Sequence, residues 1–187
     1  MLTTTQAGTA GEQLFAACVT LSSGGDLELF KPLTDDDHTD VTAGRRGKVP
    51  ALAIQVKTSL SLDPDRRASA RMTFPDGKPR EHPTFVYAIV YVSEASIERA
   101  WVIPSADFNR LTTPGAGPRG KGVQLHFEAS PSHDDRWATF RCSRLELGPQ
   151  LMKVIDGLPA GSVARVPRVP GAHFLLRRDE PRGARRP

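Results

Sequence analysis

The feature that most constrains this chain is a short apolar segment that carries two polar side chains near its end. Residues 51–56 are apolar and β-prone, which predicts a buried strand. Side chains alternate along a strand, so Gln55 and Lys57 share one face. A buried lysine is unfavourable unless a charged group pairs with it. Carboxylates occur upstream, at Glu12, Asp35, Asp36, Asp37 and Asp40.

The spacing between Asp40 and Gln55 predicts a β-hairpin. Residues 39–43 favour a short strand and residues 44–48 a polar turn, after which the apolar strand returns. In that hairpin Asp40 becomes a cross-strand neighbour of Gln55 and Lys57. The three aspartates at 35–37 compete with Asp40 as candidates, but their composition is typical of a turn. We therefore prefer Asp40, which is flanked by β-prone residues.

Glu12, Asp40, Gln55 and Lys57, taken in this order, resemble the motif of the PD-(D/E)xK nuclease superfamily. The match is to the variant in which Gln replaces the usual Glu. The local segments at residues 8–12, 36–40 and 54–58 are similar to the branch that includes Mrr-type restriction nucleases, some homing endonucleases and uncharacterised bacterial proteins. The motif covers about the first third of the chain.

This resemblance implies a fold, an activity and a cofactor. The fold would be α/β, with a restriction-endonuclease-like core in which helices flank a mixed central β-sheet. The activity would be metal-dependent hydrolysis of phosphodiester bonds in nucleic acid, with DNA as the expected substrate. Its catalytic residues would be Glu12, Asp40, Gln55 and Lys57. Asp40, Gln55, the Val56 carbonyl and Glu12 would bind Mg²⁺, with Mn²⁺ as a substitute, because Mg²⁺ prefers oxygen ligands.

Two other functions remain open from the residues alone. The chain can be a nucleic-acid-binding module of the same fold that cuts weakly or not at all. It can also be an α/β domain in which Lys57 forms a salt bridge with a nearby acid. Arg45, Arg46 and Lys48 at the predicted hairpin tip either contact phosphate or stay solvated, and we treat them as candidate nucleic-acid-binding residues.

Periodicity predicts the remaining elements. Residues 5–22 favour a first helix, and residues 84–92 a central strand covered on both faces. Residues 97–103 are its expected partner, followed by a short helix capped by Ser105. Further expected elements are strands at 27–33, 123–129 and 137–142 and a last helix within 145–158.

Charge and composition set the organisation of the chain. The net charge is +4, and residues 165–187 contain seven arginines against two acidic residues. We expect a nuclease-like domain over residues 1–164 and a partly flexible Arg/Pro-rich extension over 165–187.

The chain has no apolar run of membrane-spanning length and no signal-peptide pattern, which favours a cytoplasmic location. Because one site cuts one strand, a nuclease of duplex DNA is expected to act as a homodimer.

Overall fold

The computed structural model describes residues 2–32, 38–46 and 51–159. The acidic run at 35–37, Lys48 and the C-terminal extension at 165–187 lie outside the described residues. Among the helices that the structure does describe, none is long and apolar enough to cross a membrane.

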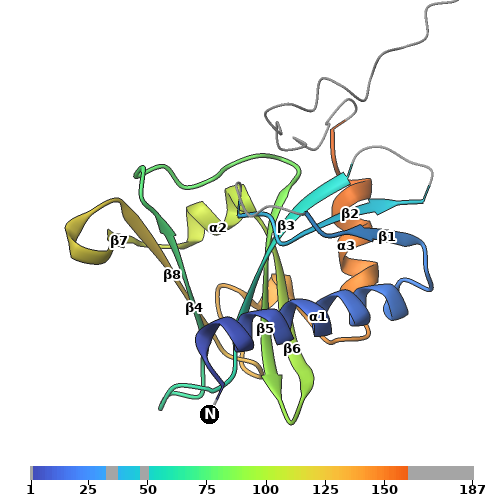
Figure 1. The fold of residues 1–187 in the computed structure, drawn as a ribbon, viewed down its shortest axis with the longest axis horizontal. Coiled ribbons are helices and arrows are strands. Elements are labelled where there is room, and N and C mark those ends of the chain that lie inside the picture. The colour runs from blue at the N-terminus through green and yellow to red at the C-terminus, as the bar shows by residue number, and fades with distance from the viewer. Residues whose placement is uncertain (1, 33–37, 47–50, 160–187) are drawn as a thin grey trace, which may run out of the picture.

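A mixed sheet forms the centre of the described chain (Figure 1). The β3–β5 pair is parallel, and the other neighbouring pairs are antiparallel. This arrangement confirms the predicted mixed α/β fold. Within the described residues the sheet has six strands, in the spatial order β1 (Leu27–Phe30), β2 (Val41–Arg45), β3 (Ala51–Ser59), β5 (Phe85–Ser93), β6 (Ser96–Pro104) and β9 (Arg141–Cys142).

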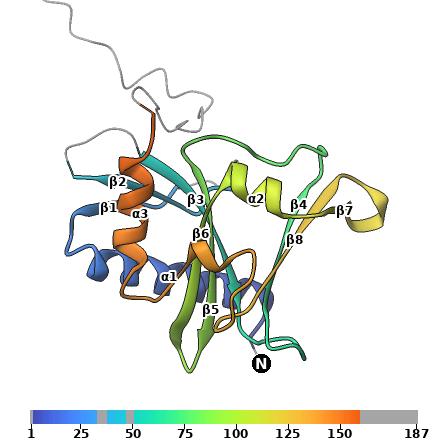
Figure 2. The same ribbon diagram turned by 180° about the vertical axis from the view of Figure 1, so that it is seen from behind.

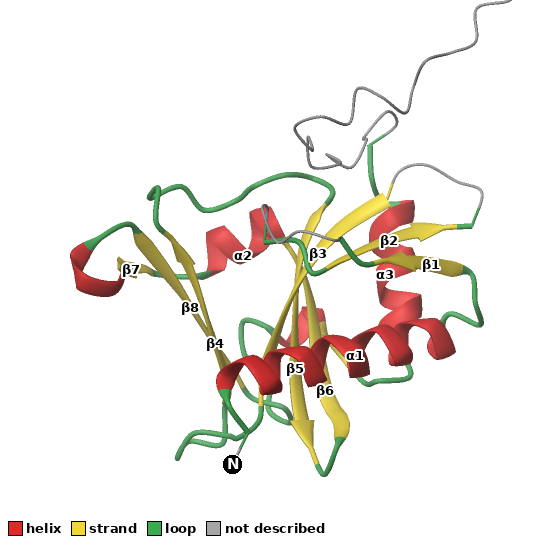
Figure 3. Cartoon of the chain, in the orientation of Figure 1, coloured by secondary structure: helices red, strands yellow, loops and turns green. Residues whose placement is uncertain are grey.

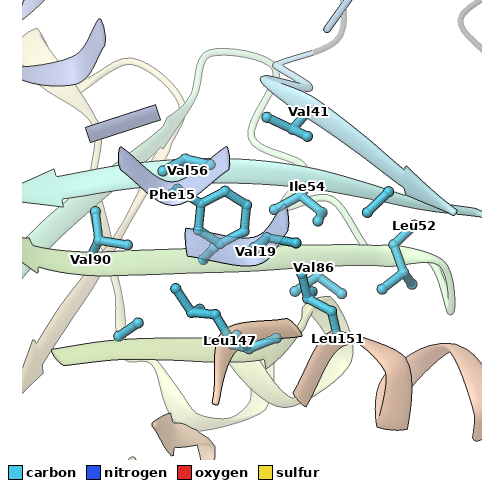
Figure 4. Close-up of a cluster of buried hydrophobic side chains, with 14 of the residues drawn as sticks. Phe15, Val19, Val41, Leu52, Ile54, Val56, Val86, Val90, Leu147 and Leu151 are labelled. Atoms are coloured by element: carbon cyan, nitrogen blue, oxygen red, sulfur yellow. The ribbon is translucent and has the colours of Figure 1, made fainter. Parts of the chain in front are cut away.

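One face of the sheet packs against helices α1 (Thr4–Ser22) and α3 (Leu147–Asp156). Helix α1 begins at a capping box in which Thr3 and Gln6 exchange hydrogen bonds, and positive-φ glycines follow its end. Figure 4 shows Phe15 and Val19 of α1 over the apolar side chains of β3 and β5, with Leu147 of α3 beside them. The helix predicted at 5–22 is thereby confirmed.

The opposite face packs against a second sheet and helix α2 (Ser105–Leu111), as Figure 3 shows. The second sheet contains β4 (Ala68–Phe74), β8 (Val123–Ala129) and β7 (Pro114–Ala116), in the order β4-β8-β7. Two buried tryptophans, Trp101 and Trp137, belong to the core between the two sheets. Strand β5 therefore lies between two cores, which confirms the expectation that both its faces are covered.

Two local predictions are wrong. Residues 137–142 are not a strand throughout, because a 3-10 turn at Ala138–Phe140 precedes the short β9. The Asp135 carboxylate accepts hydrogen bonds from the Ser130 and Trp137 main-chain N–H groups, which compete with sheet pairing. Ser105 does not cap α2; its hydroxyl instead donates to the carbonyl oxygen of His82.

Candidate active site

Strand β3 presents Gln55 and Lys57 on one face, as the alternation predicts. Leu52, Ile54 and Val56 belong to the core beneath α1 and α3. The intervening residues therefore point to the opposite face, toward the second sheet. The antiparallel ladder pairs Val41 with Ile54, so Asp40 lies just before the start of β2 and opposite Gln55. The predicted hairpin neighbours are therefore brought together.

Asp40 joins the start of β2 to the edge of β3 through two hydrogen bonds. Its main-chain N–H donates to the Ile54 carbonyl at 2.9 Å. One carboxylate oxygen, Oδ2, accepts from the Val56 main-chain N–H at 2.7 Å. The N–H and C=O of a strand residue point to the same side of the strand. The Val56 carbonyl is therefore directed to the same edge of β3 as the Asp40 carboxylate.

Gln55 is the buried member of this group, with 7% of its surface exposed. It lines a pocket of about 450 Å³ between the main sheet and the segment that follows β4. Its register partner on β5 is Tyr87, which lines the same pocket. The amide of Gln55 can therefore act on a ligand that enters between the two sheets.

Lys57 is half-buried and lies one side-chain position further along the same face of β3. Within the described part of the chain, no hydrogen bond or ion pair involves its ammonium group. The salt bridge considered from the sequence is therefore not formed with any described acid. This leaves a positive charge near Gln55 that can act on an anionic ligand.

Glu12 lies on α1 at the other face of β3 and forms an ion pair that sequence reasoning missed. The Lys31 Nζ donates to Glu12 Oε2 at 2.7 Å. This hydrogen bond and the charge of Glu12 raise the pKa of Lys31, and the Asp40 carboxylate acts in the same direction. The Lys31 ammonium group is thus attracted by both carboxylates. The β1–β2 register places Lys31 opposite Val41, next to Asp40. A correct prediction of this strand pairing would have identified Lys31 from the sequence.

The candidate metal ligands along this part of β3 all bind through oxygen, with Glu12 on the α1 side of the strand and Gln55 on the opposite side. The described residues contain no cluster of three His, Cys, Asp or Glu side chains that could hold a metal ion. Two carboxylates, the Gln55 amide and the Val56 carbonyl are instead the available ligands. Such a set suits a hard cation such as Mg²⁺, which retains several water ligands and needs few from the protein.

The predicted nucleic-acid-binding arginines lie away from Asp40, at the other end of the β2–β3 hairpin. Arg45 forms an ion pair with Asp156 of α3 at 2.8 Å. Arg46 lies 3.6 Å from Glu28, and its side chain is 80% exposed. Arg45 follows Asp40 by five residues, roughly 16 Å along an extended strand. Their contact with nucleic acid stays a prediction, as does that of Lys48, which lies outside the described residues.

Comparison with known proteins finds similarity among solved structures. No family model matches the sequence, and no curated protein matches it. Among solved structures, a bacterial homing endonuclease, I-Ssp6803I, is similar with a TM-score of 0.53 and 19% sequence identity. The likeness covers 84% of this chain and 95% of that chain. The described chain thus shares its fold with that homing endonuclease.

Proposed function

We propose that this protein is a metal-dependent endonuclease that hydrolyses phosphodiester bonds in nucleic acid, with DNA as its substrate. The observation that carries the proposal is the hydrogen bond between the Asp40 carboxylate and the Val56 N–H at 2.7 Å. This contact holds the Asp40 carboxylate at the edge of β3 beside the Val56 main chain, one strand position away from both Gln55 and Lys57. The likeness in fold to a homing endonuclease supports the same class of activity.

Asp40, Gln55, the Val56 carbonyl and Glu12 would hold a Mg²⁺ ion, for which Mn²⁺ can substitute. The ion, when bound, supplies positive charge that stabilises the charge developing on the scissile phosphate. An amide carries no charge, so the negative charge of the site comes from Asp40 and Glu12 alone. We therefore expect weaker metal binding than in a site with three carboxylates.

Lys57 orients the attacking water and offsets the negative charge that builds on the phosphate. It projects from the same face of β3 as Gln55, and no described acid neutralises it. The water must approach in line with the leaving oxygen. A group fixed on a central strand holds that geometry better than one on a loop.

Cleavage of supercoiled plasmid DNA tests the proposal. Lys57→Met removes the charge and keeps most of the side-chain volume. Asp40→Asn keeps an oxygen that can accept the Val56 N–H but removes the carboxylate. We expect each to lower the Mg²⁺-dependent cleavage rate by about 100-fold or more, the range found when one stabilising group is lost from an active site. Chelation of the metal should abolish cleavage by the wild type.

Two matched controls separate the site from general charge effects. Lys153→Met on α3 and Asp65→Asn in the turn before β4 make the same changes at exposed positions, and both should cut at the wild-type rate. Cleavage that survives both site substitutions would contradict the site. A wild type that shifts DNA in a salt-dependent way without cutting it would instead support the alternative function, a nucleic-acid-binding module.

A further inference from the structure

The second sheet ends in a hairpin whose turn is basic. Strands β7 and β8 pair antiparallel, and residues 117–122 connect them. We call this connection the β7–β8 turn. It contains Arg119 and Lys121, and both residues are exposed. Figures 1 and 2 show the hairpin at the opposite side of the molecule from α3.

Main-chain hydrogen bonds define the conformation of this turn. The Gly117 N–H donates to the Gly122 carbonyl at 3.2 Å, and the Gly120 N–H donates to the Gly117 carbonyl at 3.0 Å. The Lys121 N–H donates to the Pro118 carbonyl at 3.2 Å. A Cβ atom on Gly117 would lie 2.0 Å from the Lys121 carbonyl oxygen, so only glycine fits there. The two cations are therefore carried by a specific, hydrogen-bonded turn.

The β7–β8 turn packs beside the proposed active site. A Cβ atom on Gly122 would lie 2.2 Å from the Phe74 carbonyl oxygen and 2.8 Å from the Pro75 Cα. Phe74 and Pro75 line the pocket of about 450 Å³ that contains Gln55. The turn therefore contacts the wall of this pocket, and Lys121 is the residue next to the contact.

The two positive charges of the turn are not neutralised within the described part of the chain. Neither the Arg119 guanidinium nor the Lys121 ammonium group forms a hydrogen bond or ion pair with a described residue. In the adjoining turn after β4, Asp76 and Lys78 carry opposite charges that offset each other. Helix α2 contributes one acid and one arginine, which pair at 2.7 Å. The acid of β8, Glu128, lies at the other end of that strand.

The backbone at Arg119 also draws attention to its side chain. Its φ angle is 58°, in the left-handed region that favours glycine. Other positions in the turn are glycines, yet this one is an arginine. A residue held in an unfavourable conformation at an exposed turn favours a functional role for its side chain.

A basic turn on a two-stranded ribbon suits duplex DNA. Arginine and lysine contacts to phosphates supply much of the affinity of DNA-binding proteins, and they position the protein on the duplex. The major groove of B-DNA is wide enough to admit a two-stranded β-ribbon. The hairpin is thin as well, because β7 consists of Pro114, Gly115 and Ala116.

We propose that the β7–β8 turn binds the phosphate backbone of duplex DNA beside the cleaved bond, with Arg119 and Lys121 contacting phosphates. The inference rests on the proposed function, because it takes the Gln55 pocket as part of the cleavage site. The second sheet then serves as an arm that holds the duplex against β3.

The salt dependence of DNA binding tests this arm. Each phosphate contact contributes about 0.9 to the slope of log K against log salt concentration on duplex DNA. We expect Arg119→Gln and Lys121→Gln each to reduce that slope by about 1, as measured by fluorescence anisotropy of a labelled duplex in EDTA. Arg119→Lys and Lys121→Arg keep the charge and should keep the wild-type slope.

Arg67→Gln and Lys153→Gln are the matched controls, since they change the net charge equally at exposed positions. Arg67 precedes β4, at the end of the second sheet opposite the turn, and Lys153 lies on α3. Both controls should keep the wild-type slope. Arg119→Gly also removes the charge but suits the left-handed backbone, so it should lower the slope without lowering the melting temperature.

The outcomes separate the arm from the proposed function. Turn variants with the wild-type slope, in a protein that binds and cuts DNA, would overturn the arm and leave the proposed function intact. Slopes that fall as expected in a protein that does not cut would support the arm and overturn the proposed hydrolysis. A wild type that neither binds nor cuts DNA would overturn both.

Discussion

Lys31 places a positive charge against a carboxylate of the candidate site. Its ammonium lies 2.7 Å from Glu12, and Asp40 contributes to its raised pKa. The lysine side chain is 59% exposed. An exposed ion pair of this kind contributes about 0–1 kcal/mol, because water screens it. A divalent cation that binds Glu12 can therefore displace Lys31 without a large penalty.

Metal affinity should respond to this lysine. Lys31→Met removes the competing charge, and we expect the affinity of the DNA-free protein for Mn²⁺ to rise by up to about fivefold, the equivalent of about 1 kcal/mol. Isothermal titration calorimetry measures this directly. Glu12→Gln should lower the affinity of the DNA-free protein for Mn²⁺. Identical Mn²⁺ affinities in all three proteins would argue against Glu12 as a ligand.

Helix α1 and strand β3 approach closely at Gly11. A Cβ atom at this position would lie 1.8 Å from Thr58 Oγ1, so only glycine permits the contact. Gly8, one turn earlier in the same helix, has no atom within 4 Å of an added Cβ. The next residue after Gly11 is Glu12, so this contact sets where that carboxylate lies relative to β3.

The two glycines should respond to alanine in opposite ways. Gly11→Ala forces α1 away from β3, and we expect the free energy of unfolding to fall by about 1–3 kcal/mol. Gly8→Ala should raise it by roughly 0.5–1 kcal/mol, because alanine favours a helix interior more than glycine does. Urea denaturation of both variants measures the difference. A Gly11→Ala variant as stable as Gly8→Ala would show that the helix is not held at Thr58.

At the scale of the whole molecule, the candidate site is built once in each chain. One site cuts one strand, so cleavage of both strands of a duplex requires a second site. We expect two copies of the chain on a duplex, and light scattering coupled to gel filtration with and without DNA measures the mass. A monomer under both conditions would contradict the homodimer, and cleavage should then stop at the nicked form.

Local patterns in the sequence were sufficient for α1, β3, β5 and the hairpin contact of Asp40 with β3. Hydrophobic periodicity and turn composition depend on residues that are close along the chain, so they can be identified without tertiary information. The segment at 137–142 is the counterexample. There the Asp135 carboxylate accepts hydrogen bonds from main-chain N–H groups. These bonds take the place of the strand pairing suggested by local composition.

The sequence by itself therefore determined the main strands, the first helix and the proximity of Asp40 to Gln55. Only the tertiary structure placed Lys31 against Glu12, 19 residues away, and brought Arg80 beside Gln55. The position of Arg80 beside Gln55 depends on the parallel pairing of β3 with β5. Strand β4, which lies between these two strands in the sequence, belongs to a separate sheet. Contacts of this kind are decided by how the layers pack, which no local pattern of residues records.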